Sequence, residues 1–297
     1  MAWIEPTWGA RTYVMGILNL TPDSFSGDGL LAQGDALKAA LAQAEGFIND
    51  GADILDLGAE SSRPGAEPVS AEEELKRLLP VLKEIKSRDL KAIVSVDTWK
   101  ANVAEACLDA GADWINDIWG LRADERLAGV IARQQAGVVI MHNRSQPGAV
   151  HDLGALGRSY QGAQYTDLVP EVKADLQASL EIALEAGITM ERIILDPGLG
   201  FGKTVAQNLA LINHLDEFKG LGCPLLIGPS RKSFIGQILD LPAAEREEGT
   251  AASVAIGIAR GADIIRVHNV RLMARVAKMA DAIVRDYSIH NTFNQCK

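Results

Sequence analysis

The sequence predicts an α/β protein folded as a single-domain (β/α)₈ barrel of the TIM type. Eight short apolar segments end in polar residues, and a helical pattern follows each of them. Such barrels keep their active site at the carboxyl ends of the strands, so these polar ends also indicate where the site lies. The length of 297 residues fits one barrel, with short extensions at about residues 1–12 and 288–297.

The apolar segments are the predicted strands, and short runs of this kind suit strands that are buried on both faces. They are Val14–Asn19, Ile54–Gly58, Ile93–Asp97, Trp114–Asp117, Val138–His142, Ile193–Gly198, Leu225–Lys232 and Ile265–His268.

Helices are predicted after the strands, roughly at Asp35–Asp50, Ala71–Lys86, Lys100–Ala110, Asp124–Gln135, Thr166–Ala186, Val205–Phe218, Glu245–Arg260 and Val270–Asp286. Asp35 and Ser70 are predicted N-caps, and Ser70 with Glu73 matches a capping box. Gly-Ala-Asp recurs at Gly51, Gly111 and Gly261, where a left-handed glycine is expected to end a helix before the next strand.

Composition narrows the class of protein. A net charge of −10 and a pI near 5.1 argue against nucleic acid or an anionic membrane as a general partner. The three cysteines show no metal-ligand spacing and predict free thiols in a reducing compartment. Neither a secretory signal nor a membrane-spanning apolar run is visible, so we expect a cytoplasmic protein.

Polar residues at four strand ends are candidates for substrate recognition: Asn19, Asp97, Asn116 and Asp196. Each could instead cap the following helix. Together on one rim they suit a nitrogen-rich heterocycle, because carboxylates accept paired N–H donors. Acid–base catalysis or metal binding is the competing use.

Cationic residues follow other strand ends of this acidic chain, namely Arg63, Lys232, Arg266 and His268. The segment Ser230–Gly236 brings hydroxyls and backbone N–H groups to the start of a helix, near the last two strands, where barrels often bind phosphate. These features predict an anionic substrate with a planar, N–H-rich head group. Phe201, in a glycine-rich segment, belongs either to the core or to an apolar wall for an aromatic substrate.

Seven motifs, in order from Met15 to Val270, resemble those of the dihydropteroate synthases of folate biosynthesis: MGILNLTPDSFSGDG, GADILDLGAESSRPG, VSVDTWK, INDIWG, ILDPGLGFGKT, GPSRKSFIG and IRVHNV. The resemblance implies a pterin-binding barrel and a transferase. Its reaction displaces diphosphate from (7,8-dihydropterin-6-yl)methyl diphosphate with the amine of 4-aminobenzoate, giving 7,8-dihydropteroate. It further implies Mg²⁺ as cofactor and a homodimer, which we place on the last two or three helices. The family is a sulfonamide target, and the sequence leaves the sensitivity of this chain open.

The resemblance also implies residue roles. Asp97, Asn116, Asp196 and Lys232 would hold the pterin, and Asn19 would bind Mg²⁺. Ser62, Arg63, Arg266 and His268 would hold the diphosphate, while Phe201, Lys232, Ser233 and Pro64 would line the 4-aminobenzoate site. If diphosphate leaves early, Asp23 would shield the resulting pterin cation. The expected catalytic residues are Asp23, Arg63, Lys232 and Arg266.

Three positions depart from the family's usual pattern. Ala59 and Ser62 stand where glycine and threonine are common, and Asn269 stands where aspartate is frequent. Ala59 would matter if its backbone needed a positive φ. Two alternatives to the synthase are a methyltetrahydrofolate-dependent methyltransferase and a catalytically silent pterin-binding protein. The first has no use for a diphosphate site, and the second would have lost residues such as Asn19, Arg63 or Lys232.

Overall fold

A computed structural model describes residues 6–21, 33–146 and 148–285. Asp23 lies outside these residues, as do 1–5 and 286–297, which contain parts of the two predicted extensions. None of the helices in the described ranges is both long and apolar enough to cross a membrane.

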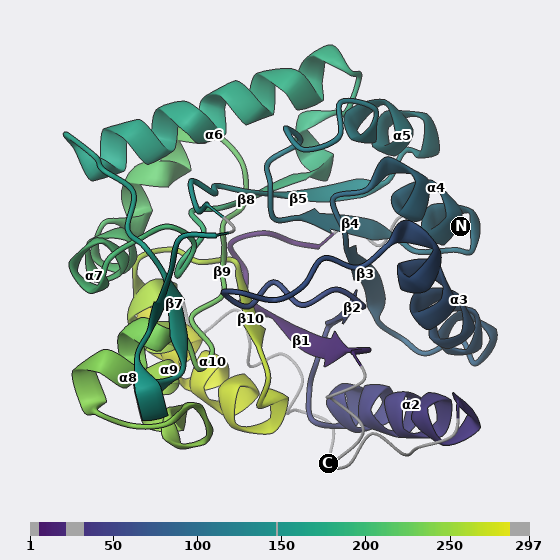
Figure 1. Cartoon of the computed structure of the whole chain (residues 1–297), viewed down its shortest axis with the longest axis horizontal. Helices are drawn as coiled ribbons and strands as arrows, with labels where there is room; N and C mark the ends of the chain where they lie inside the picture. The colour runs from purple at the N-terminus through teal and green to yellow at the C-terminus, as the bar shows by residue number, and fades with distance from the viewer. Residues whose placement is uncertain (1–5, 22–32, 147, 286–297) are drawn as a thin grey trace.

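Eight parallel strands form the predicted barrel (Figure 1). They are β1 (Tyr13–Asn19), β2 (Ile54–Gly58), β3 (Ile93–Asp97), β4 (Trp114–Asp117), β5 (Gly137–Met141), β8 (Ile193–Asp196), β9 (Leu226–Ile227) and β10 (Ile264–Val267). The sheet order is β8-β5-β4-β3-β2-β1-β10-β9. A parallel bridge between Leu195 and Leu225 joins the two ends of the sheet, and the Leu195 N–H donates to the Pro224 carbonyl at 3.0 Å.

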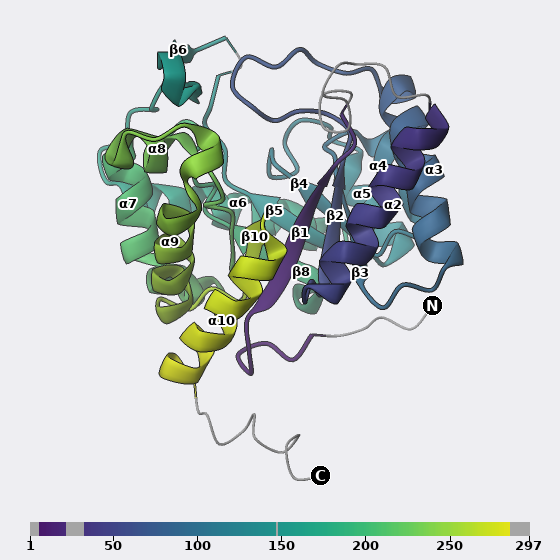
Figure 2. The same cartoon turned by 90° about the horizontal axis from the view of Figure 1, so that it is seen from below.

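Helices surround the strands (Figures 1 and 2). They are α2 (Gln33–Asn49), α3 (Ala71–Ser87), α4 (Ala101–Asp109), α5 (Leu127–Gln134), α6 (Leu168–Glu185), α7 (Val205–Asn213), α8 (Ser233–Leu239), α9 (Glu247–Ala259) and α10 (Val270–Val284). Short 3₁₀ helices are η1 (Gly154–Leu156), η2 (Met190–Arg192), η3 (Leu215–Leu221) and η4 (Ala243–Glu245).

Local signals explain several helix ends. Ser70 caps α3, because its hydroxyl accepts the Glu73 N–H at 3.2 Å. Gly51, Gly111 and Gly261 have φ values of 102°, 101° and 98°, as expected where a glycine ends a helix. The prediction for Asp35 was wrong, because α2 begins two residues earlier at Gln33.

The structure differs from the prediction in three connections. The seventh strand is limited to Leu226–Ile227, and the chain then turns at Ser230–Arg231 before entering α8. This short helix was missing from the predicted helix ranges, although Ser230–Gly236 was expected to lie at the start of a helix. The predicted helix Val205–Phe218 is divided into α7 and η3. The long segment between β5 and α6 contains an antiparallel hairpin of β6 (Val150–Asp152) and β7 (Arg158–Tyr160).

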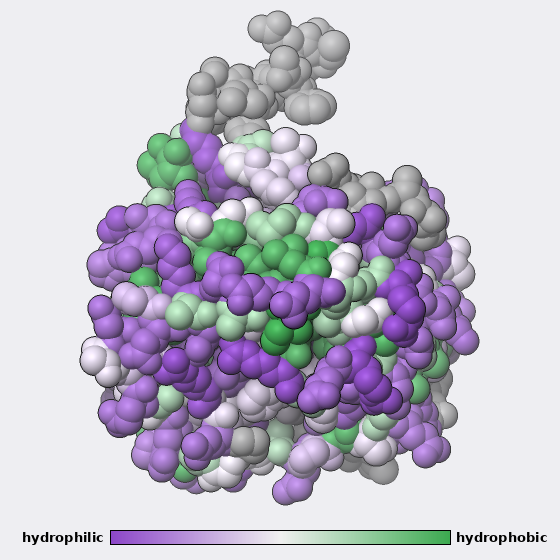
Figure 3. All heavy atoms as spheres, turned by 90° about the horizontal axis from the view of Figure 1, so that it is seen from above, coloured by the Kyte–Doolittle hydropathy of each residue, from purple (hydrophilic) through white to green (hydrophobic). Residues whose placement is uncertain are grey.

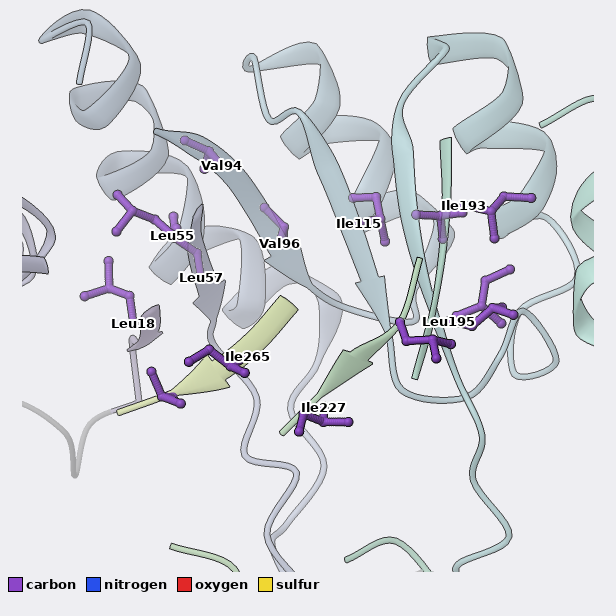
Figure 4. Packing of buried hydrophobic residues seen from close by; sticks show 14 of the residues in the cluster. Leu18, Leu55, Leu57, Val94, Val96, Ile115, Ile193, Leu195, Ile227 and Ile265 are labelled. Carbon is purple, nitrogen blue, oxygen red and sulfur yellow. The ribbon is translucent and has the colours of Figure 1, made fainter. Parts of the chain in front are cut away.

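Two apolar layers hold the barrel together. Each of the eight strands contributes one residue to an inner cluster: Met15, Ile54, Ile93, Trp114, Val139, Ile194, Leu226 and Ile264. Trp8 packs against this cluster from the amino-terminal segment. Neighbouring residues on the strands, such as Leu55, Leu57 and Ile265, belong to a second core cluster with the surrounding helices (Figure 4).

Candidate active site

A polar layer lies directly above the apolar layer inside the barrel. Side chains two residues apart on a strand point to the same face of the sheet. The residues two positions after those of the inner apolar cluster therefore also point into the barrel. Those positions include Asp56, Ser95, Asn116, Asp196 and Arg266. The register places Asp56 beside Ser95, and Asp97 beside Asn116. The strands thus bring three of the predicted site residues, Asn116, Asp196 and Arg266, into one layer at the mouth.

Arg266 joins two carboxylates at the centre of this layer. Its Nε donates to Asp56 Oδ2 at 2.6 Å and its Nη2 donates to Asp97 Oδ2 at 2.7 Å. Burial raises the pKa of Asp97 to about 7, although the charge of Arg266 opposes this shift. The pKa of Arg266 is raised by its carboxylate neighbours against the effect of its burial, so this side chain remains a cation.

Asp56 was missed by the sequence analysis, although a signal was present. It lies between Leu55 and Leu57 in the middle of a strand, where the alternation of side chains turns it toward the barrel interior. It accepts hydrogen bonds from Ser95 Oγ at 2.6 Å and Asn116 Nδ2 at 3.1 Å as well as from Arg266. A charged residue inside an apolar strand could have been identified on that basis.

Asp196 is held by the glycine-rich segment that follows β8. Its Oδ1 accepts the Gly198 N–H at 2.7 Å. Gly198 has a φ of 73°, and a Cβ there would lie 1.9 Å from the His142 carbonyl oxygen, so glycine is required for this turn. Burial raises the pKa of Asp196, and the Gly198 hydrogen bond and the charge of Lys232 oppose that shift.

Lys232 and Phe201 meet beside Asp196. The Lys232 ammonium lies 4.1 Å from the centroid of the Phe201 ring and donates to the Leu199 carbonyl. Burial lowers the pKa of Lys232 to about 8, while the charge of Asp196 opposes this shift. Ser233 follows as the first residue of α8. An aromatic face and a cation therefore lie on one side of the mouth.

A set of buried hydrogen bonds around Lys203 holds the glycine-rich segment that follows β8. The Lys203 ammonium donates to the carbonyls of Gly198 and Phe201, at 2.9 and 3.0 Å, and to His142 Nδ1 at 3.0 Å. When Lys203 is protonated it can only donate, so the His142 hydrogen then lies on Nε2, which is 3.0 Å from Asp175 Oδ2. His142 is therefore a hydrogen-bonded residue of the barrel.

His268 lies where the positive charges of the site converge. Burial lowers its pKa to about 3, and the charges of Arg266, Arg231, Arg63 and Lys232 add to this effect. The expected positive charge of His268 is therefore absent, and the imidazole is neutral. Ser230 Oγ accepts the His268 backbone N–H at 3.2 Å and lies 2.9 Å from Nδ1. If Ser230 donates to Nδ1, the ring presents Nε2–H as a donor for an anion.

The second loop, residues 59–70 between β2 and α3, is fixed at its base and exposed at its tip. Lys100 bonds to Glu60 and Glu74, and Glu60 accepts the Val69 N–H at 3.1 Å. Between these anchors, Ser62 and Pro64 are partly buried and the Arg63 residue is exposed.

Two departures from the family pattern have a structural explanation. Ala59 is absent from the residues with positive φ in the described part of the chain, so its side chain causes no backbone strain. Asn269 is the N-cap of α10, because its Oδ1 accepts the Leu272 N–H at 3.2 Å. Asparagine and aspartate serve this role about equally well.

Comparison with known proteins gives consistent results. A family model described as pterin binding enzyme matches residues 15–268. The dihydropteroate synthase of Bacillus subtilis is 48% identical over 281 residues, which cover 95% of this chain and 92% of that protein. A crystal structure of dihydropteroate synthase from Clostridium difficile in the presence of pteroic acid matches with a TM-score of 0.85 and 43% identity, covering 94% of this chain and 99% of that one. The Xanthomonas albilineans enzyme with 4-aminobenzoic acid matches with a TM-score of 0.82 and 37% identity, covering 92% and 93%.

Proposed function

The chain belongs to the pterin binding enzymes and is a dihydropteroate synthase, and we propose that the buried charge cluster at the barrel mouth is its active site. It is thus a transferase, which joins (7,8-dihydropterin-6-yl)methyl diphosphate to 4-aminobenzoate. One observation carries the assignment of the site. Carboxylates and four cations occupy neighbouring parts of one mouth. The cations are those whose charges act on His268, namely Arg63, Arg231, Lys232 and Arg266.

The carboxylate part suits the pterin. Asp196 and Asp97 are hydrogen-bond acceptors at strand ends, and a pterin offers adjacent ring N–H and amino donors. Oδ1 of Asp196 already accepts the Gly198 N–H, but a carboxylate oxygen has room for a second donor. Asn116 and Lys232 supply a carboxamide and a donor to the same space. These residues orient the substrate so that its methylene carbon lies toward the cations.

The cationic part suits the diphosphate. In the reaction the C–O bond to diphosphate breaks, the leaving oxygen takes the electron pair, and the arylamine nitrogen forms the new C–N bond and loses a proton. Arg266, Arg63 and the Nε2–H of His268 would stabilise the negative charge that develops on the leaving group. Ser62 would bind the same diphosphate, and Phe201, Pro64, Ser233 and Lys232 would position the arylamine. Asp23 retains its predicted role beside the pterin cation and lies outside the described residues.

Magnesium fits the donors at the mouth. A Cβ placed on Gly58 would lie 3.9 Å from both Asn19 Oδ1 and Asp97 Oδ2, so two hard oxygen donors border the same space. The described residues contain no group of three or more His, Cys, Asp or Glu arranged around a metal position. Mg²⁺ commonly binds through one or two protein oxygens together with substrate phosphates and water. Asn19 would therefore hold the ion, which would neutralise charge on the diphosphate.

A coupled assay for diphosphate release tests the function. The purified chain with the pterin diphosphate and Mg²⁺ should release diphosphate when 4-aminobenzoate is added, and dihydropteroate should form in equal amount. Arg266→Met should reduce the rate, whereas a substitution at an exposed residue far from the mouth, Leu184→Glu, should leave it unchanged. Methyl transfer from methyltetrahydrofolate without diphosphate release would instead support the methyltransferase alternative.

A homodimer is proposed through α8 and α9, two of the last three helices, together with α7, which replaces α10 in the expected interface. These helices border an apolar groove of about 300 Å³, where Leu209, Ile238 and Ile256 are 44–51% exposed. On the side of α6, hydrophilic residues border a hydrophobic area (Figure 3). Light scattering should show a dimer that Ile238→Glu dissociates and Leu184→Glu does not; a monomeric wild type would refute this interface.

Two finer assignments complete the proposal. A 4-aminobenzenesulfonamide has the shape and the amine of 4-aminobenzoate, so it should inhibit competitively at the pocket beside Phe201. A cytoplasmic location is proposed because Cys107 and Cys223 are free thiols in the described chain, as expected in a reducing compartment. Inhibition that 4-aminobenzoate fails to relieve, or export of the chain in cell fractionation, would contradict these assignments.

A further inference from the structure

The β6–β7 hairpin connects parts of the mouth that are distant in sequence. In Figure 2 it stands at the end of the barrel where β1 ends. The Tyr160 hydroxyl donates to the Ser62 carbonyl at 3.2 Å, across 98 positions of the chain. The Tyr160 ring also stacks on Phe201, with centroids 6.0 Å apart and planes inclined by 28°. One side chain therefore contacts both the second loop and the aromatic wall beside Lys232.

The Tyr160 hydroxyl is suited to a fixed donor role. Burial raises its pKa above the usual value near 10, so the phenol keeps its proton at neutral pH. The Phe201 ring contacts Tyr160 and the Lys232 ammonium, which lies 4.1 Å from the ring centroid. Stacking and cation–π contacts each favour a particular ring orientation. Tyr160 thus helps to set the orientation of Phe201 as well as the path of the loop at Ser62.

The hairpin is also anchored to the turn that enters α8. Arg246 is 2% exposed, and its guanidinium donates to the carbonyls of Leu156, Arg231, Lys232 and Leu241. Leu156 lies between β6 and β7, whereas Arg231 and Lys232 form the turn that enters α8. A Cβ on Gly236 would lie 2.2 Å from Arg246 Nη2, so α8 packs directly against the guanidinium. Arg246 therefore fixes the hairpin relative to Lys232.

We propose that Tyr160 is a positioning residue for the pocket of the aromatic amine. Its contacts keep Phe201 and the Ser62 loop in the positions that form this pocket. This inference rests on the proposed function, because it takes Phe201 and the second loop to line the 4-aminobenzoate site. Tyr160 lies apart from the carboxylates assigned to the pterin. Its bond to Ser62, however, reaches the loop assigned to the diphosphate. Its loss should therefore weaken the use of the amine more than the use of the pterin diphosphate.

The test compares Tyr160→Phe, Tyr160→Ala and the exposed control His151→Ala, which lies on the strand paired with β7. Steady-state rates are measured with each substrate varied in turn, after circular dichroism has shown that the variants are folded. Tyr160→Phe loses the bond to Ser62 and should raise KM for 4-aminobenzoate about fivefold. Tyr160→Ala also loses the ring contact and should raise it at least about tenfold. The value of KM for the pterin diphosphate should rise less than that for 4-aminobenzoate in both Tyr160 variants.

The outcomes separate this inference from the proposed function. A wild type that releases no diphosphate on addition of 4-aminobenzoate would overturn both. An active wild type, with both Tyr160 variants at the wild-type KM for 4-aminobenzoate, would overturn the role of Tyr160 alone. Equal losses with both substrates would also contradict it, because they would indicate general damage to the mouth. A selective rise in KM for the amine, absent from His151→Ala, would support it.

Discussion

Replacing Arg266 with methionine removes the cation that joins two buried carboxylates. Its bonds to Asp56 and Asp97 are 2.6 and 2.7 Å long, and the acceptor side chains are 0% and 12% exposed. Breaking a buried pair by removing one partner typically costs about 3–5 kcal/mol, because the remaining charge is uncompensated. Two hydrogen bonds to charged groups, at about 1.5–3 kcal/mol each, give a similar sum. We expect the free energy of unfolding at pH 8 to fall by about 3–5 kcal/mol.

The loss in this variant should depend on pH. In the folded protein the pKa of Asp97 is about 7, raised mainly by burial, whereas an unfolded aspartate titrates near about 3.9. The folded state thus binds more protons between these values, so the contribution of Asp97 to stability falls as the pH rises from about 4 to about 7. Without Arg266, which opposes the rise in pKa, that fall should extend to higher pH. The cost of the substitution should therefore be smaller at pH 5 than at pH 8.

Urea denaturation at pH 5 and pH 8 measures this difference for the wild type, Arg266→Met and the double variant Arg266→Met/Asp97→Asn. The double variant removes one of the two uncompensated charges, so it should recover part of the loss at pH 8 and show a weaker pH dependence. An equal loss at both pH values, together with no recovery in the double variant, would refute the reasoning.

Three further substitutions test other parts of the site. Asp196→Asn should weaken pterin diphosphate binding by about 2 kcal/mol or more, because an amide offers a donor where the pterin also donates; calorimetry showing unchanged pterin affinity would remove Asp196 from the site. Asn19→Ala should raise the Mg²⁺ concentration that gives half-maximal turnover, and a superimposable Mg²⁺ titration would contradict its role as the ligand. Burial lowers the folded-state pKa of Lys203 to about 7 from about 10.5, so its contribution to stability should rise as the pH increases between these values. Lys203→Met should lose this rise, and an unchanged difference in unfolding free energy between pH 7 and pH 9 would count against it.

The sequence predicted the barrel because its strands carry a strong and repeated signal. Each apolar run is short, ends in polar residues and precedes a helical pattern, and the structure confirms all eight strands. The extent of helix α8 was not predicted, because its seven residues are too few for a clear periodicity. Its position depends on Arg246, which follows it in the chain and packs against Gly236. A helix that is positioned by a residue outside it need not show a hydrophobic pattern in its own sequence.

The candidate site was predictable where a residue's place on a strand determined its surroundings. Asp97, Asn116, Asp196 and Arg266 share the mouth because parallel strands end together. Tyr160 was missed because its role depends on contact with a backbone carbonyl 98 positions away. Ser62 carries no side-chain signal for that contact, since the acceptor is its main chain. The β6–β7 hairpin likewise joins the site through tertiary contacts rather than through a motif.

The two acids bonded to Arg266 have different surroundings, although the sequence presents both as aspartates at inward positions. Asp56 accepts three donors, from Ser95, Asn116 and Arg266, and its side chain is fully buried. A carboxylate satisfied in this way holds its neighbours in place and has little capacity left for a ligand. Asp97 lies one layer nearer the mouth, is 12% exposed and meets Arg266 through a single oxygen. The barrel thus fixes Arg266 from below through Asp56, so that Asp97 is the acid available to a substrate from above.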